Sequence, residues 1–111
     1  MLSSPRDFAT LMERGTIRSH PLLSTRVLRT DLGATRFGLA TSRALGSAVV
    51  RNRVRRRLRE ALRSVAPRLR PGWDVLVVAK PGLVAADYRA LTETLSRLLR
   101  RSGVLGGEDE R

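Results

Sequence analysis

Residues 51–63 constrain this chain more than any other segment, because they combine seven arginines with an apolar residue at every third or fourth position. A helix turns by about 100° per residue, so this spacing gathers the apolar side chains on one side and the guanidinium groups on the other. The apolar arc is Val50, Val54, Leu58, Ala61, Leu62 and Val65, and the opposite arc is Asn52, Arg53, Arg56, Arg59, Glu60 and Arg63. The segment is therefore predicted to be a helix that docks on a sheet through one arc and exposes the other.

The exposed arc carries a single carboxylate, that of Glu60, in a segment with seven arginines. A solvated helix face normally mixes signs at i and i+4, where opposite charges stabilise each other by roughly 0.2–0.5 kcal/mol per pair. A merely solvated face is thus the weaker interpretation. Arginine's planar fork suits phosphate, and five to seven phosphate contacts give a slope of log affinity against log salt of about −3.5 to −6. The helix is predicted to bind a polyanion.

The rest of the composition agrees with a nucleic-acid partner. The chain has 111 residues, with 22 basic against 10 acidic residues and a net charge of +12, so it should be steered to RNA or DNA. Its length fits one domain, residues 1–111, with one modest core. Cysteine is absent, which excludes disulfides and thiolate metal sites, and no stretch approaches the roughly 20 apolar residues of a membrane span. A cytoplasmic protein with no membrane partner is expected.

Two further helices are predicted from capping residues and spacing. The first spans residues 4–15, with Ser4 as the N-cap and Gly15 as the end. The last begins at Asp87, repeats leucine at helical spacing and ends at Gly103. Residues 103–111 are expected to form a flexible tail.

Three strands are predicted. Residues 25–30 and 35–41 alternate well enough to predict an antiparallel hairpin, with Phe37 on one face of the second strand and Arg36 on the other. Residues 73–80 are apolar on both sides, which is typical of an interior strand. The order helix, strand, strand, basic helix, strand, helix predicts an α+β sandwich in which helices cover one side of a small sheet.

The other face of that sheet is expected to be open. A shallow basic face suits an extended single strand of nucleic acid, which also needs aromatic rings on which bases stack. The chain has only four such rings, those of Phe8, Phe37, Trp73 and Tyr88. Each is expected in the core before it is expected on the surface, and Phe8 and Phe37 are the candidates for stacking.

No set of side chains predicts that the protein catalyses a reaction by itself. His20 is the only histidine, which excludes a paired-imidazole mechanism, and the acidic residues are scattered without the convergence that two-metal cleavage needs. No GxxxxGK phosphate loop is present. The alternative to an enzyme subunit is a structural RNA- or DNA-binding protein. DNA is not expected, because no second positioning helix or hydrophobic dimer face accompanies the basic helix.

Several segments resemble the protein component of bacterial ribonuclease P. Residues 37–60 are similar to that family's signature strand, basic turn and Arg-Asn-Arg helix. Residues 74–81 and the last helix match its later elements, and Arg6-Asp7-Phe8 and Arg14-Gly15 match its first helix. The resemblance covers nearly the whole chain and is loosest over residues 16–35.

This resemblance implies a fold with an unusual left-handed β-α-β crossover. It also implies the protein subunit of a ribonucleoprotein endonuclease that binds a catalytic RNA and the 5′ leader of precursor tRNA, and that assists removal of the leader. Hydrolysis then belongs to the RNA with Mg²⁺. The resemblance assigns no catalytic residue and no cofactor to the protein, and leaves any metal site on it unknown.

The resemblance also assigns two sets of residues. Contacts to the catalytic RNA would come from Ser42, Arg43, Arg51, Asn52, Arg53, Arg55, Arg56, Arg59 and Arg63. Contacts to the leader would come from Phe8, Arg26, Arg36 and Phe37, on the open sheet face with the first helix. The chain departs from the family pattern at Ala44, where a second basic residue is usual, and it has fewer aromatic residues near the first helix. Leader binding is therefore expected to depend on phosphate contacts more than on stacking.

Overall fold

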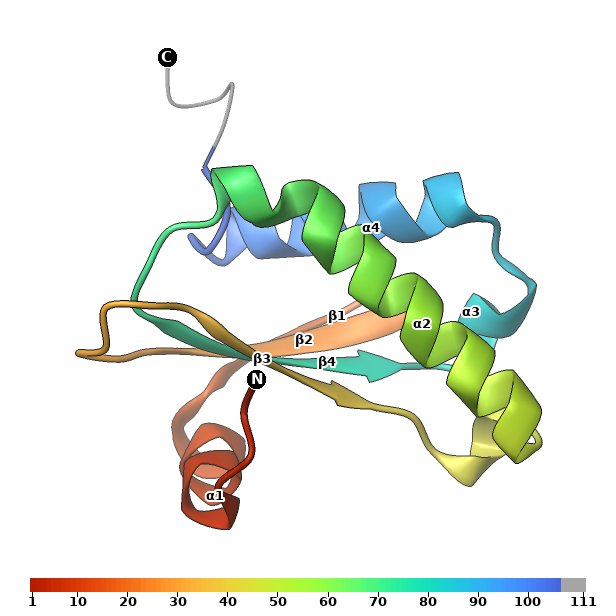
Figure 1. The fold of residues 1–111 in the computed structure, drawn as a ribbon, viewed down its shortest axis with the longest axis horizontal. Helices are drawn as coiled ribbons and strands as arrows, with labels where there is room; N and C mark the ends of the chain where they lie inside the picture. Colours follow the sequence, from red (N-terminus) through yellow and green to blue (C-terminus); the bar gives the residue numbers. More distant parts are fainter. Residues whose placement is uncertain (107–111) are drawn as a thin grey trace.

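The computed structural model describes residues 1–106, and a four-stranded sheet runs through its centre (Figure 1). The strands are β1 (Thr16–Ser19), β2 (Leu23–Arg29), β3 (Arg36–Ala40) and β4 (Trp73–Ala79). The helices are α1 (Pro5–Arg14), α2 (Ala48–Val65), α3 (Gly82–Ala85) and α4 (Tyr88–Arg101), with 3-10 turns at Arg43–Leu45 and Ala66–Arg68. The α+β class and the long helices match the sequence predictions.

The predicted hairpin is wrong, because β4 lies between its two strands. The strand order is β1-β2-β4-β3, so β2 pairs with β4 in the antiparallel sense and β3 pairs with β4 in the parallel sense. β4 is buried along almost its whole length, as its apolar sequence on both faces predicts, and the central place gives both of its edges a partner. β2 pairs on its other edge with β1, a short exposed strand that the sequence analysis missed.

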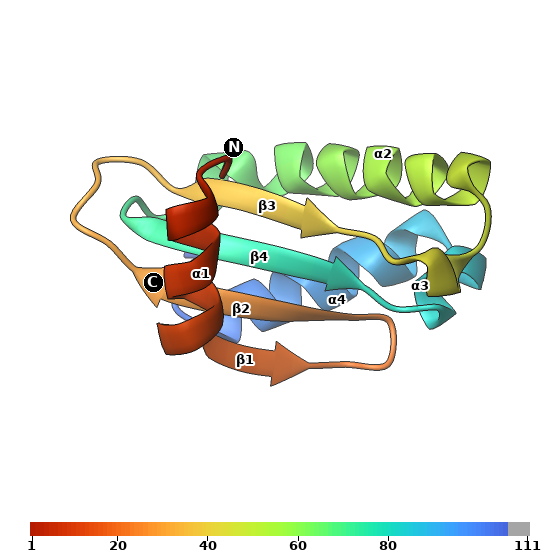
Figure 2. The ribbon, with the colours of Figure 1, turned by 90° about the horizontal axis from the view of Figure 1, so that it is seen from below.

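The connection from β3 through α2 to β4 is a left-handed crossover. In Figure 2, the chain runs along β3, passes behind the sheet into α2, and comes forward again into β4, which lies below β3 and points the same way. Followed from β3 to β4, this path turns in the left-handed sense. Parallel β-α-β units are right-handed in about 98% of cases. This agrees with the expectation drawn from the family resemblance.

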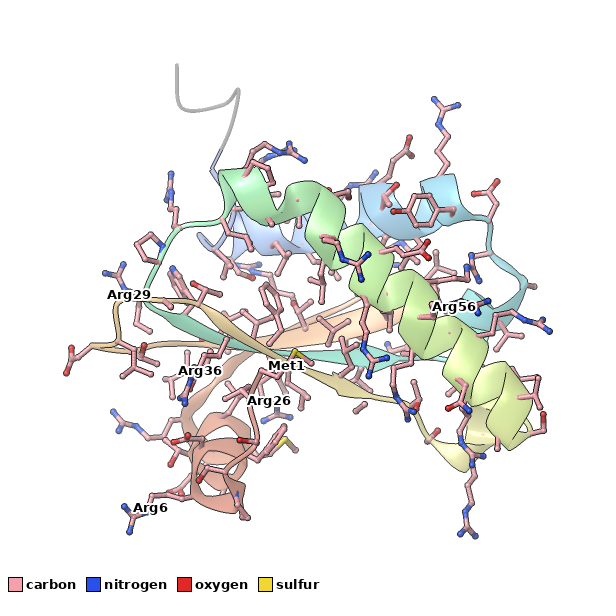
Figure 3. The ribbon with its side chains drawn as sticks, viewed as in Figure 1. Met1, Arg6, Arg26, Arg29, Arg36 and Arg56 are labelled. Carbon is pink, nitrogen blue, oxygen red and sulfur yellow. The ribbon has the colours of Figure 1, made fainter. Side chains whose placement is uncertain are left out.

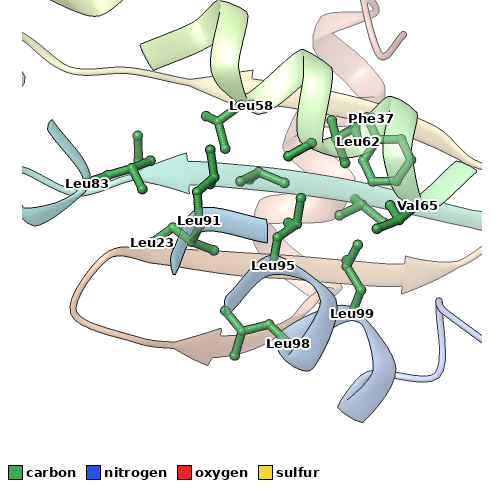
Figure 4. Close-up of a cluster of buried hydrophobic side chains, with 14 of the residues drawn as sticks. Leu23, Phe37, Leu58, Leu62, Val65, Leu83, Leu91, Leu95, Leu98 and Leu99 are labelled. Carbon is green, nitrogen blue, oxygen red and sulfur yellow. The ribbon is translucent and has the colours of Figure 1, made fainter. Parts of the chain in front are cut away.

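The main core lies between the sheet and the layer formed by α2 and α4 (Figure 4). From α2 it takes the predicted apolar arc, since Val54, Leu58 and Val65 are almost fully buried, and Val50 is half-buried at the helix start. Ser47 caps α2 by accepting a hydrogen bond from the amide of Val50 at 3.3 Å. The helix is therefore fixed against the sheet by its apolar side.

A second, smaller cluster lies on the opposite face of the sheet, where α1 crosses the strands (Figure 2). Leu11 of α1 is fully buried there against Leu76 of β4, and Leu2 closes the cluster. The expectation that helices cover only one side is thus wrong. α1 covers part of the second face because its few apolar residues match the apolar residues that β4 presents on that side.

The first residues of the predicted flexible tail are ordered against the core. Gly103 has a φ of +88°, so it reverses the chain after α4 as predicted. Val104 and Leu105 are nevertheless buried, and the amide of Gly106 donates a hydrogen bond to the carbonyl of Arg68 at 2.8 Å. Residues 103–106 are therefore packed on the core, and the remainder of the predicted tail, 107–111, lies outside the described residues.

Candidate nucleic-acid interface

The outer side of α2 presents a row of cations. The predicted outer arc is exposed along the whole helix, and Figure 3 labels Arg56 on α2. Within residues 1–106, Arg53, Arg56, Arg59 and Arg63 have no hydrogen bond or ion pair with another side chain. At a rise of about 1.5 Å per residue, the row from Arg53 to Arg63 extends over roughly 15 Å. We call this surface, from Asn52 to Arg63, the arginine face.

The start of α2 adds further polar groups beside the arginine face. Ser42 and Arg43 are exposed in the turn that leads from β3 to α2. Arg51 donates to the carbonyl of Gly46 at 2.9 Å, so its guanidinium leaves the helix end instead of entering the apolar arc. Arg55 donates to the hydroxyl of Thr41 and to the side-chain oxygen of Asn52. The structure therefore brings the predicted catalytic-RNA residues together along one helix and the turn before it.

A shallow hollow interrupts the arginine face near its start. It is lined by Val49, Asn52, Arg53 and Arg56, and Val49 exposes 68% of its surface. Two guanidinium groups and an amide around an apolar floor suit a phosphate with the sugar or base beside it. This hollow therefore offers one place on the arginine face where a nucleotide would fit.

Phe8 lies on the second face of the sheet, where α1 crosses β3. A side-chain carbon placed on Gly38 would come within 2.9 Å of the Phe8 ring, so Gly38 is the strand position that lets this ring pack closely on the sheet. The ring is half-buried and keeps an exposed part. Phe8 therefore has the position predicted for it, on the face that α1 only partly covers.

Arg36 holds α1 and the sheet together. Its guanidinium makes two hydrogen bonds with Asp74 of β4, at 2.9 and 2.7 Å, and one with Asp7 of α1, at 3.0 Å. Asp74 is buried, and the hydrogen bonds that its carboxylate accepts from Arg36 raise the pKa of Arg36, with Asp7 adding to the shift. The predicted leader contact at Arg36 thus has three of its donors occupied by carboxylates, which makes it a positioning residue for α1.

Replacing Arg36 tests this positioning role. Arg36→Gln should lower the midpoint of thermal unfolding by more than Asp7→Asn, because it leaves the buried Asp74 carboxylate without its charged partner. Amide hydrogen exchange in α1 should become faster in both variants. Equal midpoints for Arg36→Gln and the parent protein would contradict the role.

Arg26 has a similar place at the other end of α1. It donates a hydrogen bond to the carbonyl of Met12, and Figure 3 shows it with Arg36 between the sheet and α1. The aliphatic part of Arg26 lies close to Gly15, where α1 ends. Both predicted basic leader contacts therefore help to fix α1 on the sheet.

Phe37 lies on the other face of the sheet from Phe8, and here the prediction fails. Its ring is 8% exposed and belongs to the main core, beneath α2. Strand alternation already separates Phe37 from Arg36, and side chains on opposite faces of one strand cannot line one groove. Phe37 is a core residue and not part of the surface beside α1.

Lys80 is a residue of this surface that the sequence analysis missed. It follows β4, and its ammonium group donates a hydrogen bond to the hydroxyl of Ser19 in β1, across the part of the sheet that α1 leaves open. The alternation Leu76, Val78, Lys80 places it on the α1 side. That alternation is the signal that could have found it. We call the partly covered face with Phe8, Ser19, Ser24 and Lys80 the α1-side face.

Residues 1–106 contain no candidate metal site and no candidate membrane span. No group of three His, Asp or Glu side chains in this range is arranged to hold a metal ion. None of the helices in the same range is both long and apolar enough to cross a membrane.

A helix that packs on a mixed sheet through its apolar side and exposes a row of arginines has the features of a small nucleic-acid-binding protein. A family model described as ribonuclease P matches residues 1–103. The ribonuclease P protein component of Herpetosiphon aurantiacus is 41% identical over 101 residues, covering 91% of this chain and 82% of that protein. The protein component of Roseiflexus castenholzii is 35% identical over 107 residues, covering 96% of this chain and 88% of that protein.

Solved structures give the same result for the fold. The ribonuclease P protein of Thermotoga maritima has a TM-score of 0.82 at 25% identity, covering 90% of this chain and 94% of that chain. That of Staphylococcus aureus has a TM-score of 0.85 at 20% identity, covering 95% of this chain and 96% of that chain. The chain belongs to the bacterial ribonuclease P protein component family, whose members are ribonucleoprotein subunits with a role in tRNA processing.

Proposed function

We propose that this chain is the protein subunit of a ribonuclease P ribonucleoprotein, in which the arginine face binds the catalytic RNA and the α1-side face binds the 5′ leader of precursor tRNA. The RNA with its bound Mg²⁺ performs the hydrolysis. The protein contributes assembly of the complex, affinity for the leader and screening of phosphate charge. We place this activity in the cytoplasm.

The arginine face is the observation that carries the proposal. The other side of the helix is buried in the core, and four of the arginines are exposed and have no side-chain partner among residues 1–106: Arg53, Arg56, Arg59 and Arg63. The helix holds the arginines at fixed spacing, and the planar guanidinium fork loses less freedom per hydrogen bond to phosphate than lysine does, so such a surface favours a structured polyanion. Because the chain belongs to the ribonuclease P protein component family, the catalytic RNA is the polyanion that we assign to this surface.

The α1-side face supports the second contact. It combines the exposed part of the Phe8 ring with the ammonium group of Lys80 and the hydroxyls of Ser19 and Ser24. A partly exposed ring and a cation on one open sheet face are features of surfaces that bind single-stranded RNA. It has one ring, which agrees with a leader contact that depends mainly on phosphates.

Cleavage of a precursor tRNA at low Mg²⁺ concentration tests the proposal. The cognate catalytic RNA alone, the protein alone and the two together should be compared. We expect cleavage at the mature 5′ end only when both components are present. Cleavage by the protein alone would reveal an active site in the protein, and no effect of the protein would favour a structural RNA-binding role.

Phe8 should affect the leader and not the catalytic RNA. Phe8→Ala is expected to weaken binding of precursor tRNA to the assembled complex by about 1 kcal/mol or more, the lower end for loss of one stacked base. Affinity for the catalytic RNA should stay as in the parent. Precursor tRNA without its leader is the control substrate, and an equal loss of affinity for it would place Phe8 away from the leader.

A further inference from the structure

A polar groove lies between α4 and the end of α2, in the layer on the far side of the sheet from α1. It has a volume of about 550 Å³, which is within the range of small-ligand sites. Its walls include Ser64 and Arg68 from the end of α2 and the turn after it, and Tyr88, Thr92, Ser96 and Arg97 from α4. We call it the α2–α4 groove. It lies outside both surfaces described above.

The charge of the groove is suited to an anion. The guanidinium groups of Arg68 and Arg97 form no hydrogen bond or ion pair with another residue in the range 1–106. The carboxylate of Glu93 also borders the groove, but it is paired with Arg89 at 3.1 Å. The carboxylate is thus largely neutralised, and the two arginines are available to phosphate groups.

Tyr88 supplies an aromatic ring at the same place. It is 41% exposed, whereas Phe37 is in the core, Phe8 packs on Gly38, and the Trp73 ring is covered by the guanidinium of Arg29 at 5.3 Å. An exposed ring that lines the same groove as two arginines can act as a stacking platform for a nucleobase. Tyr88 is therefore the most exposed ring of the four, and it borders the groove.

The hydroxyl groups of the groove favour RNA over DNA. Ser64 donates its proton to the carbonyl of Ala61 at 2.7 Å, and Thr92 donates to the carbonyl of Arg89 at 3.0 Å. Their oxygens keep lone pairs and can only accept further hydrogen bonds. The ribose 2′-hydroxyl is a donor that DNA lacks.

We propose that the α2–α4 groove binds a single-stranded segment of RNA, with Arg68 and Arg97 on successive phosphates and a base stacked on Tyr88. It is then a third RNA-binding surface, next to the end of the arginine face and across the sheet from the α1-side face. The inference rests on the proposed function only in that the RNA is either the catalytic RNA or precursor tRNA. Both RNAs present the same phosphates, riboses and bases to the groove.

The single tyrosine allows a direct test of the site. Protein that carries 3-fluorotyrosine has one ¹⁹F signal, at residue 88, and can be titrated with a ten-nucleotide RNA of mixed sequence. We expect the signal to shift as the RNA binds, and the DNA of the same sequence to require a higher concentration. A signal that stays unchanged while the RNA saturates the protein would overturn the proposal, and equal binding of the DNA would overturn the choice of RNA.

Variants test the assigned contacts with the same RNA. Tyr88→Ala should weaken binding at least about fivefold, and Tyr88→Phe should bind like the parent, because only the ring is needed. Arg68→Gln with Arg97→Gln should reduce the salt slope by about 1.4, at roughly 0.7 per phosphate on a single strand. The matched control is Arg18→Gln with Arg101→Gln, which removes the same charge from exposed positions outside the groove. Equal losses in both pairs would overturn the assignment.

Affinities for the two full RNAs then identify the source. A loss in the Arg68 and Arg97 variant confined to the catalytic RNA, or confined to precursor tRNA, supports the groove and names its occupant. If this variant binds both RNAs like the parent while charge reversal in the arginine face abolishes binding, the groove proposal fails and the proposed function stands. If the parent protein itself binds neither RNA, both fail. Tyr88 and Arg97 are exposed and Arg68 is half-buried, so an unchanged unfolding midpoint is needed to confirm that the fold of each variant is intact.

Discussion

Charge reversal at Arg53 and Arg56 together is expected to weaken binding of the catalytic RNA by about 100-fold or more at moderate salt, since each charge-assisted hydrogen bond contributes about 1.5–3 kcal/mol. Both side chains line the hollow on the arginine face and have no partner among residues 1–106. The slope of log affinity against log salt should fall by about 1–2 units, because two fewer phosphates release their counterions. A filter-binding titration at several salt concentrations measures both quantities.

A control must separate this local effect from the loss of net positive charge. Arg18→Glu with Arg101→Glu changes the net charge by the same amount at exposed positions that do not belong to the arginine face. This control should lower the association rate more than it raises the dissociation rate, because it acts through long-range steering. If it weakened binding as strongly as the Arg53 and Arg56 variant, binding would depend on overall charge and the arginine face would have no special role.

The parts of the fold that the sequence predicts are those determined by local periodicity. The two arcs of α2, the start of α4 after Asp87 and the interior character of β4 each follow from residues close together in the chain, and the structure confirms them. Strand pairing is not local. Residues 30–35 are short enough for a hairpin turn, but β4 arrives 33 residues after β3 ends and pairs with both strands. No property of β2 or β3 alone shows that β4 pairs with both of them.

The candidate site shows the same division. The composition of the arginine face can be read from helical spacing, and so can its outward direction. The α1-side face cannot be read in this way, because it depends on how α1 lies over the strands. Arg36 is a basic strand residue in the sequence, and only the fold reveals that Asp7 and Asp74 occupy its guanidinium. Basic residues near a binding surface are thus of two kinds: some are available to a ligand, and others hold the surface together. The presence of a carboxylate or carbonyl partner within the protein distinguishes the second kind from the first.

Phe37→Ala is expected to destabilise the protein by about 3–5 kcal/mol, the usual cost of truncating a buried phenylalanine. Phe37 is 8% exposed and packs beside Leu62 and Val65 beneath α2 (Figure 4). Small domains have a total stability of only about 5–15 kcal/mol, so a substantial part of it would be lost. Denaturant unfolding followed by Trp73 fluorescence measures the change, and Phe8→Ala should cost less because that ring is only half-buried.

A milder variant separates this core role from a contact with the leader. Phe37→Leu keeps most of the apolar volume, so it should be more stable than Phe37→Ala and stay folded under assay conditions. Because the ring faces α2 and not the α1-side face, we expect Phe37→Leu to bind precursor tRNA like the parent, while Phe8→Ala loses affinity that depends on the leader. A folded Phe37→Leu variant that lost the same leader-dependent affinity would show that Phe37 contacts the leader. Either result decides whether the two faces of β3 have separate tasks, with core packing beneath α2 and RNA binding beside α1.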